Sequence, residues 1–271
     1  ILLSLIVFII TMVLTALAST GAPFLHPTSN VSNEFTTQVT PSGWTFAIWG
    51  IIYAFMASVL VYVLSGVFRN AYGYVYCSPP VLPRGFFVML SLNLSLNVAW
   101  LFLWDRLMIP AVIFLIFIAL TNYAVIAFSC LGLNAYGAWL YKNHKVDLYL
   151  IRVQNGIAIY ATWTTIASLV NLNIVLTTEA NMSQTDASTT VLSLLVVVIA
   201  TFVLENWLLE KHVRYILSIY PAVIWALTGV FTNNYDASAP SRNNIFIVLL
   251  ALACVIFVTR IGLVIWRHKK Q

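Results

Sequence analysis

Residues 188–208 read STTVLSLLVVVIATFVLENWL, and this stretch decides the class of fold. Its central run, Val196-Val197-Val198-Ile199-Ala200, is apolar at every position, so every face of the segment is hydrophobic. A membrane β-strand alternates apolar and polar residues, whereas a membrane helix needs about 20 mainly apolar residues to cross the hydrocarbon. The stretch therefore predicts a transmembrane α-helix.

The composition of the whole chain supports the same class. Of its 271 residues, 61% are hydrophobic and only 8% are charged, and the mean hydropathy is +0.93. A soluble globular protein is about a quarter charged, so these charges are too few to cover a soluble surface. We therefore expect an integral membrane protein whose main partner is the lipid bilayer. The composition excludes a cytosolic enzyme, a nucleic-acid-binding protein and a disordered chain.

Eight stretches are long and apolar enough to cross a membrane as helices. The weakest boundary lies at residues 210–214, where the chain must turn tightly between the sixth and seventh stretches. The first stretch has an alternative interpretation as the apolar part of a signal peptide. The sequence predicts an all-α membrane protein with about eight transmembrane helices, at approximately residues 1–18, 45–68, 85–104, 108–131, 148–176, 188–208, 213–232 and 244–266.

Basic residues gather on one side of the predicted bundle. Loops rich in Lys and Arg stay in the cytosol during insertion, so we expect both termini to be cytosolic. Arg260 lies inside the last span and is expected to extend its long side chain toward the cytosolic interface. Ten of the 13 basic residues lie in the even-numbered loops and the C-terminus: Arg69, Arg84, Lys142, Lys145, Arg152, Lys211, Arg214, Arg267, Lys269 and Lys270.

Two N-x-S/T acceptors, at Asn30 and Asn181, fall on the opposite side of the predicted membrane. Such sites accept glycans in the secretory pathway, although so short a pattern also occurs by chance. With glycans, the protein would be a glycoprotein of the endoplasmic reticulum or the plasma membrane. A third acceptor, at Asn93, lies within a span and is expected to be inert.

The sequence contains none of the common catalytic or metal-binding patterns. GxSxG, Walker A, GxGxxG and HExxH are absent. The three cysteines, Cys77, Cys130 and Cys254, form neither a paired framework nor a metal-ligand cluster. Glu205 lies near membrane depth and is interpreted as a solvated helix end, with a proton or cation site as the alternative. We predict no catalytic residue and no metal site, and the protein is not expected to be an enzyme.

Polar and aromatic side chains within the spans indicate where a ligand would bind. Asn93 and Asn97 are four residues apart and share a helix face with Trp100. Trp49, Trp100 and Trp163 each lie beyond the first turn of their spans, so together they would form an apolar pocket for a planar polycyclic ligand. The alternative is structural, because Asn, Ser and Thr bond between helices and Trp anchors helices at the membrane surface.

Three motifs, on the second, third and fifth predicted spans, resemble the translocator protein family, also called tryptophan-rich sensory proteins (TspO). The resemblance covers residues 1–177 and implies a five-helix ligand-binding bundle, followed by a three-helix membrane extension at residues 178–271. The departures include the spacing of Trp44 and Trp49, which are five apart where six is common, so Trp44 is not expected in the pocket. The motifs are Pro41-Ser42-Gly43-Trp44 with Trp49-Gly50-Ile51-Ile52-Tyr53, Leu96-Asn97-Val98-Ala99-Trp100, and Tyr160-Ala161-Thr162-Trp163 with Ala167-Ser168 and Asn171.

The resemblance also implies a function. Family members bind porphyrins, haem, sterols and aromatic drugs in a pocket closed by the first loop, here residues 21–41, and many are dimers. Some bacterial members promote light-dependent porphyrin breakdown, and animal members usually reside in the mitochondrial outer membrane. The ligand, a tetrapyrrole or a sterol-like molecule, would contact Trp49, Tyr53, Asn97, Trp100, Tyr160 and Trp163.

Three hypotheses for function follow from these observations. The first is a membrane receptor or sensor that binds a hydrophobic polycyclic ligand, alone or as a homodimer. The second is a transporter of lipophilic metabolites, which would use the intramembrane polar groups. The third is a structural subunit whose C-terminal spans dock another membrane protein.

Overall fold

The computed structural model describes the chain except residues 1, 22, 69–80, 145–146, 239 and 270–271, which include Cys77 and the predicted cytosolic Arg69, Lys145 and Lys270. The described residues form helices and connecting segments without a β-strand, which confirms the all-α prediction. The elements are α1 (Leu2–Thr20), α2 (Thr28–Glu34), the 3₁₀ helix η1 (Gly43–Ala47), α3 (Ile48–Phe68), α4 (Arg84–Trp104), α5 (Met108–His144), α6 (Asp147–Thr178), α7 (Gln184–Leu208), α8 (Glu210–Val213), α9 (Ile219–Asn234) and α10 (Pro240–His268).

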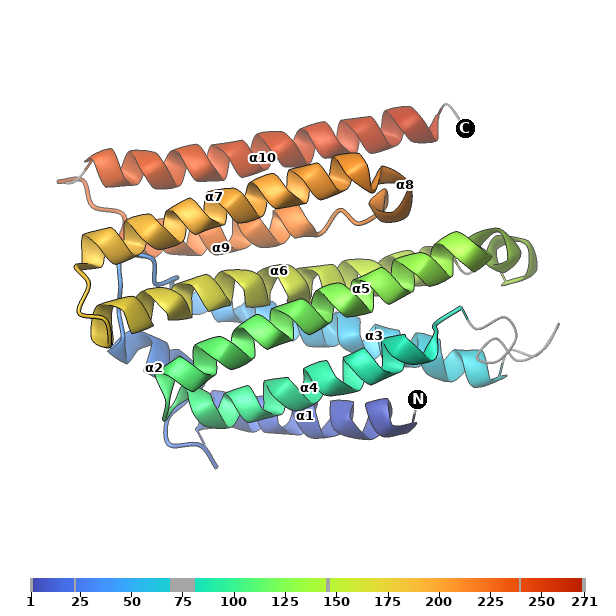
Figure 1. The fold of residues 1–271 in the computed structure, drawn as a ribbon, viewed down its shortest axis with the longest axis horizontal. Helices are drawn as coiled ribbons and strands as arrows, with labels where there is room; N and C mark the ends of the chain where they lie inside the picture. The colour runs from blue at the N-terminus through green and yellow to red at the C-terminus, as the bar shows by residue number, and fades with distance from the viewer. Residues whose placement is uncertain (1, 22, 69–80, 145–146, 239, 270–271) are drawn as a thin grey trace.

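The long helices run alternately in opposite directions, and both termini lie at the same end of the bundle (Figure 1). α6 lies at the centre, because it packs against α3 and α5 on one side and against α7 and α9 on the other. α1 and α10 form the two outer edges, where large apolar side chains such as Leu2, Val248 and Val258 are exposed. Exposed apolar side chains on outer helices are what a lipid environment requires.

Seven of the described helices are long and apolar enough to span a membrane. The seventh predicted span, at residues 213–232, differs from its prediction because α9 begins only at Ile219 and has 16 residues. At 1.5 Å per residue it is about 24 Å long, shorter than the roughly 30 Å of hydrocarbon. α9 runs opposite to its neighbours α7 and α10, but by length it is not one of the membrane-spanning helices among the described residues (Figure 1).

Asn155 of α6 explains why α9 starts late. Its side-chain amide donates a hydrogen bond to the Tyr215 carbonyl oxygen (2.8 Å). Its carbonyl oxygen Oδ1 accepts from the backbone N–H groups of Leu217 (2.8 Å) and Ser218 (3.0 Å). These bonds satisfy the backbone of the connection between α8 and α9, so the connection stays non-helical where the sequence predicted helix.

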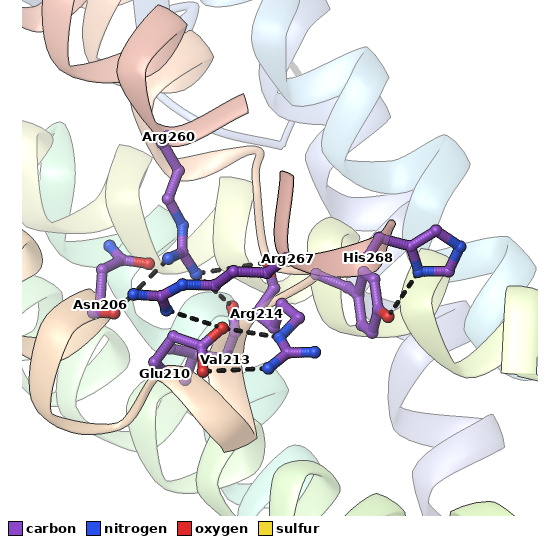
Figure 2. A network of polar contacts seen from close by, with 8 residues as sticks. Asn206, Glu210, Val213, Arg214, Arg260, Arg267 and His268 are labelled. Carbon is purple, nitrogen blue, oxygen red and sulfur yellow. Dashed lines mark hydrogen bonds and ion pairs between the residues drawn. The ribbon is translucent and has the colours of Figure 1, made fainter. Parts of the chain in front are cut away.

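Arg260 of α10 reaches toward the turn at residues 210–214, in the predicted direction, but it stays buried and bonds to the backbone there. Its side chain is buried and turns into the bundle (Figure 2). The guanidinium donates hydrogen bonds to the carbonyl oxygens of Asn206 (3.5 Å), Val213 (3.2 Å) and Arg214 (3.2 Å). These carbonyls lie at the C-terminal ends of α7 and α8, where the helix dipole favours a cation.

Charged side chains of α8 and of the C-terminal end of α10 form a group at the end of the bundle that holds the two termini. Glu210 of α8 forms ion pairs with Arg214 (2.6 Å) and with Arg267 of α10 (3.0 Å) (Figure 2). Hydrogen bonds from Arg214, and then from Arg267, lower the pKa of Glu210 to about 2. The short helix α8 is therefore joined to the end of the last helix by charge.

Candidate functional site

The site begins where η1 leads into α3. Trp49 and Tyr53 are four residues apart on α3, so they share one face of the helix. Their rings stack with centroids 5.9 Å apart and an interplanar angle of 22°. The Tyr53 hydroxyl forms a hydrogen bond with Thr15 Oγ1 of α1 (2.7 Å), which fixes the ring against the first helix.

α4 contributes a second set of aromatic rings. Asn97, Trp100 and Trp104 are three or four residues apart and face the same side of the helix. Trp100 stacks on Trp49 with centroids 6.2 Å apart, and on Trp104 with centroids 5.6 Å apart. The Trp104 indole N–H donates to the Thr28 carbonyl oxygen (3.2 Å), so α2 of the first loop is bonded to α4 beside the rings.

α6 completes the cluster with Tyr160 and Trp163. The edges of both rings meet Trp49, with centroid distances of 5.9 Å and 6.5 Å and interplanar angles of 65° and 88°. Trp49 therefore contacts four aromatic rings from three helices, and each such pair contributes about 0.5–1.5 kcal/mol beyond its buried area. The structure brings all six predicted ligand-binding residues together, and their role in binding stays a prediction.

Two hollows adjoin this cluster. The larger, about 140 Å³, has a partly polar lining that includes Thr15, Thr28 and Asn97. The smaller, about 40 Å³, is almost entirely apolar. Phe46, Trp49 and Trp100 line both hollows, so these three side chains form the partition between them. Together the two hollows are called the aromatic cavity below.

Several buried polar atoms at the aromatic cavity have no hydrogen-bond partner among the described residues. The Asn97 amide donates to the Tyr160 hydroxyl (2.8 Å), but its Oδ1 accepts no bond. The indole nitrogens of Trp100 and Trp163 and both polar atoms of the Asn171 side chain are likewise unpartnered. A buried donor without a partner costs about 1–3 kcal/mol, so a ligand group that accepts from these donors would regain that energy.

The sequence reasoning missed part of the lining. Phe46 and Trp104 line the smaller hollow, although Trp104 could have been found because it follows Trp100 by one helical turn. Asn171 also lines it and lies eight residues after Trp163 on the same helix. Ala226 and Val230 come from α9, and no sequence signal distinguishes these small apolar residues from any others in a span.

Other residues that the sequence singled out lie elsewhere. Trp44 is half exposed and meets Trp225 of α9 edge-on, outside the aromatic cavity as expected. Asn93 is fully buried and its amide donates to Ile118 O and Thr121 Oγ1, both at 2.9 Å, so it joins α4 to α5. Glu205 is half-buried beside a separate small hollow.

The two predicted glycosylation sites are exposed at one end of the bundle. Asn30 lies in α2, and Asn181 lies in the turn between α6 and α7, where its positive φ of 52° is one that Asn tolerates well. Both elements lie at the end opposite the termini (Figure 1). No group of three metal-ligating side chains occurs in the part of the chain that the structure describes.

The chain was compared with protein families, curated proteins and solved structures. The family model described as TSPO-like protein matches residues 1–262. Comparison with curated proteins and with solved structures gave no match. The family match confirms the resemblance in the sequence motifs, and it extends past residue 177 through most of α10. The chain therefore belongs to the TSPO-like protein family.

Proposed function

We propose that this TspO-type membrane protein is a receptor or sensor that binds a flat hydrophobic polycyclic molecule in the aromatic cavity. The observation that carries the proposal is the position of Trp49, which contacts four rings and separates two hollows. Aromatic walls with a few polar groups are typical of small-molecule sites. A planar ligand would gain contact area by stacking between these rings.

The unpartnered polar atoms narrow the chemistry of the ligand. The indole N–H groups of Trp100 and Trp163 can only donate, so they favour a ligand that carries acceptor oxygens or nitrogens at its edge. Asn171 can both donate and accept. A metal-free porphyrin has flat apolar faces and acidic edge groups, and a sterol-like molecule offers one oxygen. We favour the porphyrin because it meets more than one donor.

The test is a titration of the purified protein with protoporphyrin IX, followed by the Soret band. Trp49→Phe and Trp163→Phe are expected to weaken binding about 2- to 10-fold, the effect of losing one aromatic contact of 0.5–1.5 kcal/mol. Trp207→Phe is the matched control, since Trp207 of α7 is exposed and lines neither hollow. Equal affinities in all four proteins would refute the assignment of the cavity as the binding site.

We propose binding, and not catalysis, as the role of the cavity. Among the residues that the structure describes, no Asp, Glu, His, Lys or Cys side chain lines either hollow to act as a general acid or base. Light-dependent porphyrin breakdown is the alternative that the family resemblance carries. Illumination of the same protoporphyrin complex tests it, because breakdown would bleach the Soret band in the wild-type protein faster than in Trp49→Phe.

We also propose that both termini are cytosolic and that the membrane belongs to the secretory pathway, with the mitochondrial outer membrane as the alternative. Arg214, Arg267 and Lys211 support this orientation, because they lie at the end of the bundle that holds the termini. The exposed acceptors at Asn30 and Asn181 lie at the other end. The proposed partners are the lipid bilayer, the hydrophobic ligand and a second copy or another membrane subunit.

A further inference from the structure

Helix α9, which lies beyond the five-helix bundle predicted at residues 1–177, is hydrogen-bonded to the short stretch of chain that leads into the aromatic cluster. This stretch, residues 40–45, is called segment 40–45. The Ser42 backbone N–H donates to the Gly229 carbonyl oxygen (3.0 Å), and the Ser42 hydroxyl lies within hydrogen-bond distance of the same oxygen (3.2 Å) and of Thr232 Oγ1 (2.9 Å). Segment 40–45 is therefore joined at Ser42 to the middle of α9.

Further contacts extend this junction in both directions. The Trp225 indole N–H donates to the Thr45 carbonyl oxygen (2.9 Å), and the Trp225 ring meets Trp44 edge-on at a centroid distance of 5.0 Å. At the other end, the side-chain amides of Asn233 and Asn234 donate to the Thr40 carbonyl oxygen (3.0 and 2.8 Å). Trp225, Gly229 and Thr232 are three or four residues apart and so share one face of α9, and Asn233 and Asn234 add contacts at the end of the helix.

Gly229 permits this close approach. A Cβ atom at this position would lie 2.5 Å from Thr45 Oγ1 and 2.7 Å from Thr45 Cγ2, well inside van der Waals contact. The Thr45 side chain is itself completely buried, so it has little room to move away. Any larger residue at 229 would therefore displace η1, which carries Thr45 and Phe46 and leads directly into Trp49.

The same helix supplies a wall of the aromatic cavity. Ala226 and Val230 lie on either side of Gly229 along α9, are buried, and line the smaller hollow with Trp49 and Trp163. Because both side chains are small, the hollow extends to the surface of α9. A bulky residue at either position would fill that space.

We propose that α9 determines the shape and the opening of the aromatic cavity, by bonding segment 40–45 in place and by supplying the small residues Ala226 and Val230 to the wall. The proposal rests on the proposed function, in that the cavity is taken as the binding site. It gives a role to part of the chain beyond the five-helix bundle, because α9 completes the wall of the site. Ligand release then requires segment 40–45 to separate from α9.

The first experiment tests the junction without any ligand. Hydrogen exchange of segment 40–45, measured by mass spectrometry on the full chain in detergent, is expected to be faster in Gly229→Ala than in the wild type. Gly262→Ala is the matched control, because nothing lies within 4 Å of a Cβ at Gly262 on α10. Unchanged exchange in Gly229→Ala would overturn the junction.

The second experiment uses protoporphyrin IX and follows its release by stopped flow. Gly229→Ala is expected to release the porphyrin about fivefold faster, since affinity changes within one site appear mainly in the dissociation rate. Val230→Phe is expected to weaken binding by a similar factor, whereas Val248→Phe, on the exposed face of α10, leaves it unchanged.

The two proposals fail in different ways. If Trp163→Phe weakens porphyrin binding but Gly229→Ala and Val230→Phe do not, the cavity binds the ligand and α9 has no part in it. If the wild-type protein binds no porphyrin, the proposed function is refuted, and hydrogen exchange alone decides whether α9 holds segment 40–45.

Discussion

The hydrogen bond between Asn97 and Tyr160 provides a quantitative test of how the cavity is built. It joins α4 to α6 beside Trp49, with 2.8 Å between Nδ2 and the hydroxyl oxygen. Both side chains are at most 2% exposed. Tyr160→Phe removes the hydroxyl and leaves the whole Asn97 amide without a partner among the described residues, because its Oδ1 is already unpartnered. Asn97→Leu removes the amide and leaves the hydroxyl.

The expected magnitude follows from the setting of the bond. Hydrogen bonds between membrane helices contribute about 0.6 kcal/mol on average and up to about 1.7 kcal/mol. Full burial of both partners places this pair at the upper end. We expect each single substitution to lower the free energy of unfolding by about 1–2 kcal/mol. The double substitution leaves no unpartnered group. Its loss of unfolding free energy should therefore be smaller than the sum of the two single losses, by at least about 1 kcal/mol.

SDS-induced unfolding in mixed micelles, followed by tryptophan fluorescence, measures these free energies without altering a tryptophan. The bond between Tyr123 and Thr165 (2.8 Å) is the control, because it joins α5 to α6 away from the cavity with both residues half-buried. Tyr123→Phe with Thr165→Val should show a smaller coupling. Strict additivity of Asn97→Leu and Tyr160→Phe would show that the two side chains do not interact and would refute the geometry.

Three further predictions concern the rest of the molecule. Arg260→Met should lower the free energy of unfolding by about 2–3 kcal/mol, measured in the same micelles, because three helix-end carbonyls lose a charged donor. Hydrogen bonds, the strongest from Arg214, lower the pKa of Glu210 from its usual 4.5 to about 2. The ionised carboxylate therefore stabilises the fold fully above pH 4.5, and this stabilisation is lost as the pH falls toward 2. Glu210→Gln should therefore flatten the acid limb of the stability profile, and an unchanged limb would contradict the ion pairs. Treatment with a glycosidase should increase the electrophoretic mobility of the mature protein, and the increase should be smaller in Asn30→Gln and in Asn181→Gln. No shift in the wild-type protein would exclude glycans at both sites.

The helical membrane fold and the identity of the aromatic residues could be predicted because both depend on local patterns. Seven of the eight predicted spans are helices long enough to cross a membrane, and α9 is too short. Runs of about 20 apolar residues define spans, and a spacing of three or four places side chains on one face. Trp49, Trp100 and Trp163 could thus be grouped from the amino-acid sequence alone. Each lies beyond the first turn of a separate span, and these spans, the second, third and fifth of those predicted, resemble helices of one family.

The contributions of α9 and Arg260 could not be predicted, because they depend on which helices become neighbours. Ala226 and Val230 are ordinary apolar residues until α9 packs beside η1. The position of Arg260 in the last span predicts that its side chain extends toward the cytosolic interface, but not that it is buried against other helices. Its burial depends on carbonyls at the ends of two other helices, which no pattern within α10 encodes.

The bonding of α6 indicates which part of the cavity can move. Between helices in lipid there is little hydrophobic driving force, so polar contacts largely specify which faces meet. Thr165 of α6 bonds Tyr123 of α5, and the Asn173 amide donates to Ser188 Oγ of α7 (3.3 Å). Together with Asn155 at its other end, these bonds fix α6 along its length. Segment 40–45, in contrast, is joined to the C-terminal part of the bundle through its hydrogen bonds to the single helix α9. A ligand that needs more room will then open this junction before it moves α6. We therefore expect the cavity to open at its junction with α9, while Tyr160 and Trp163 stay in place.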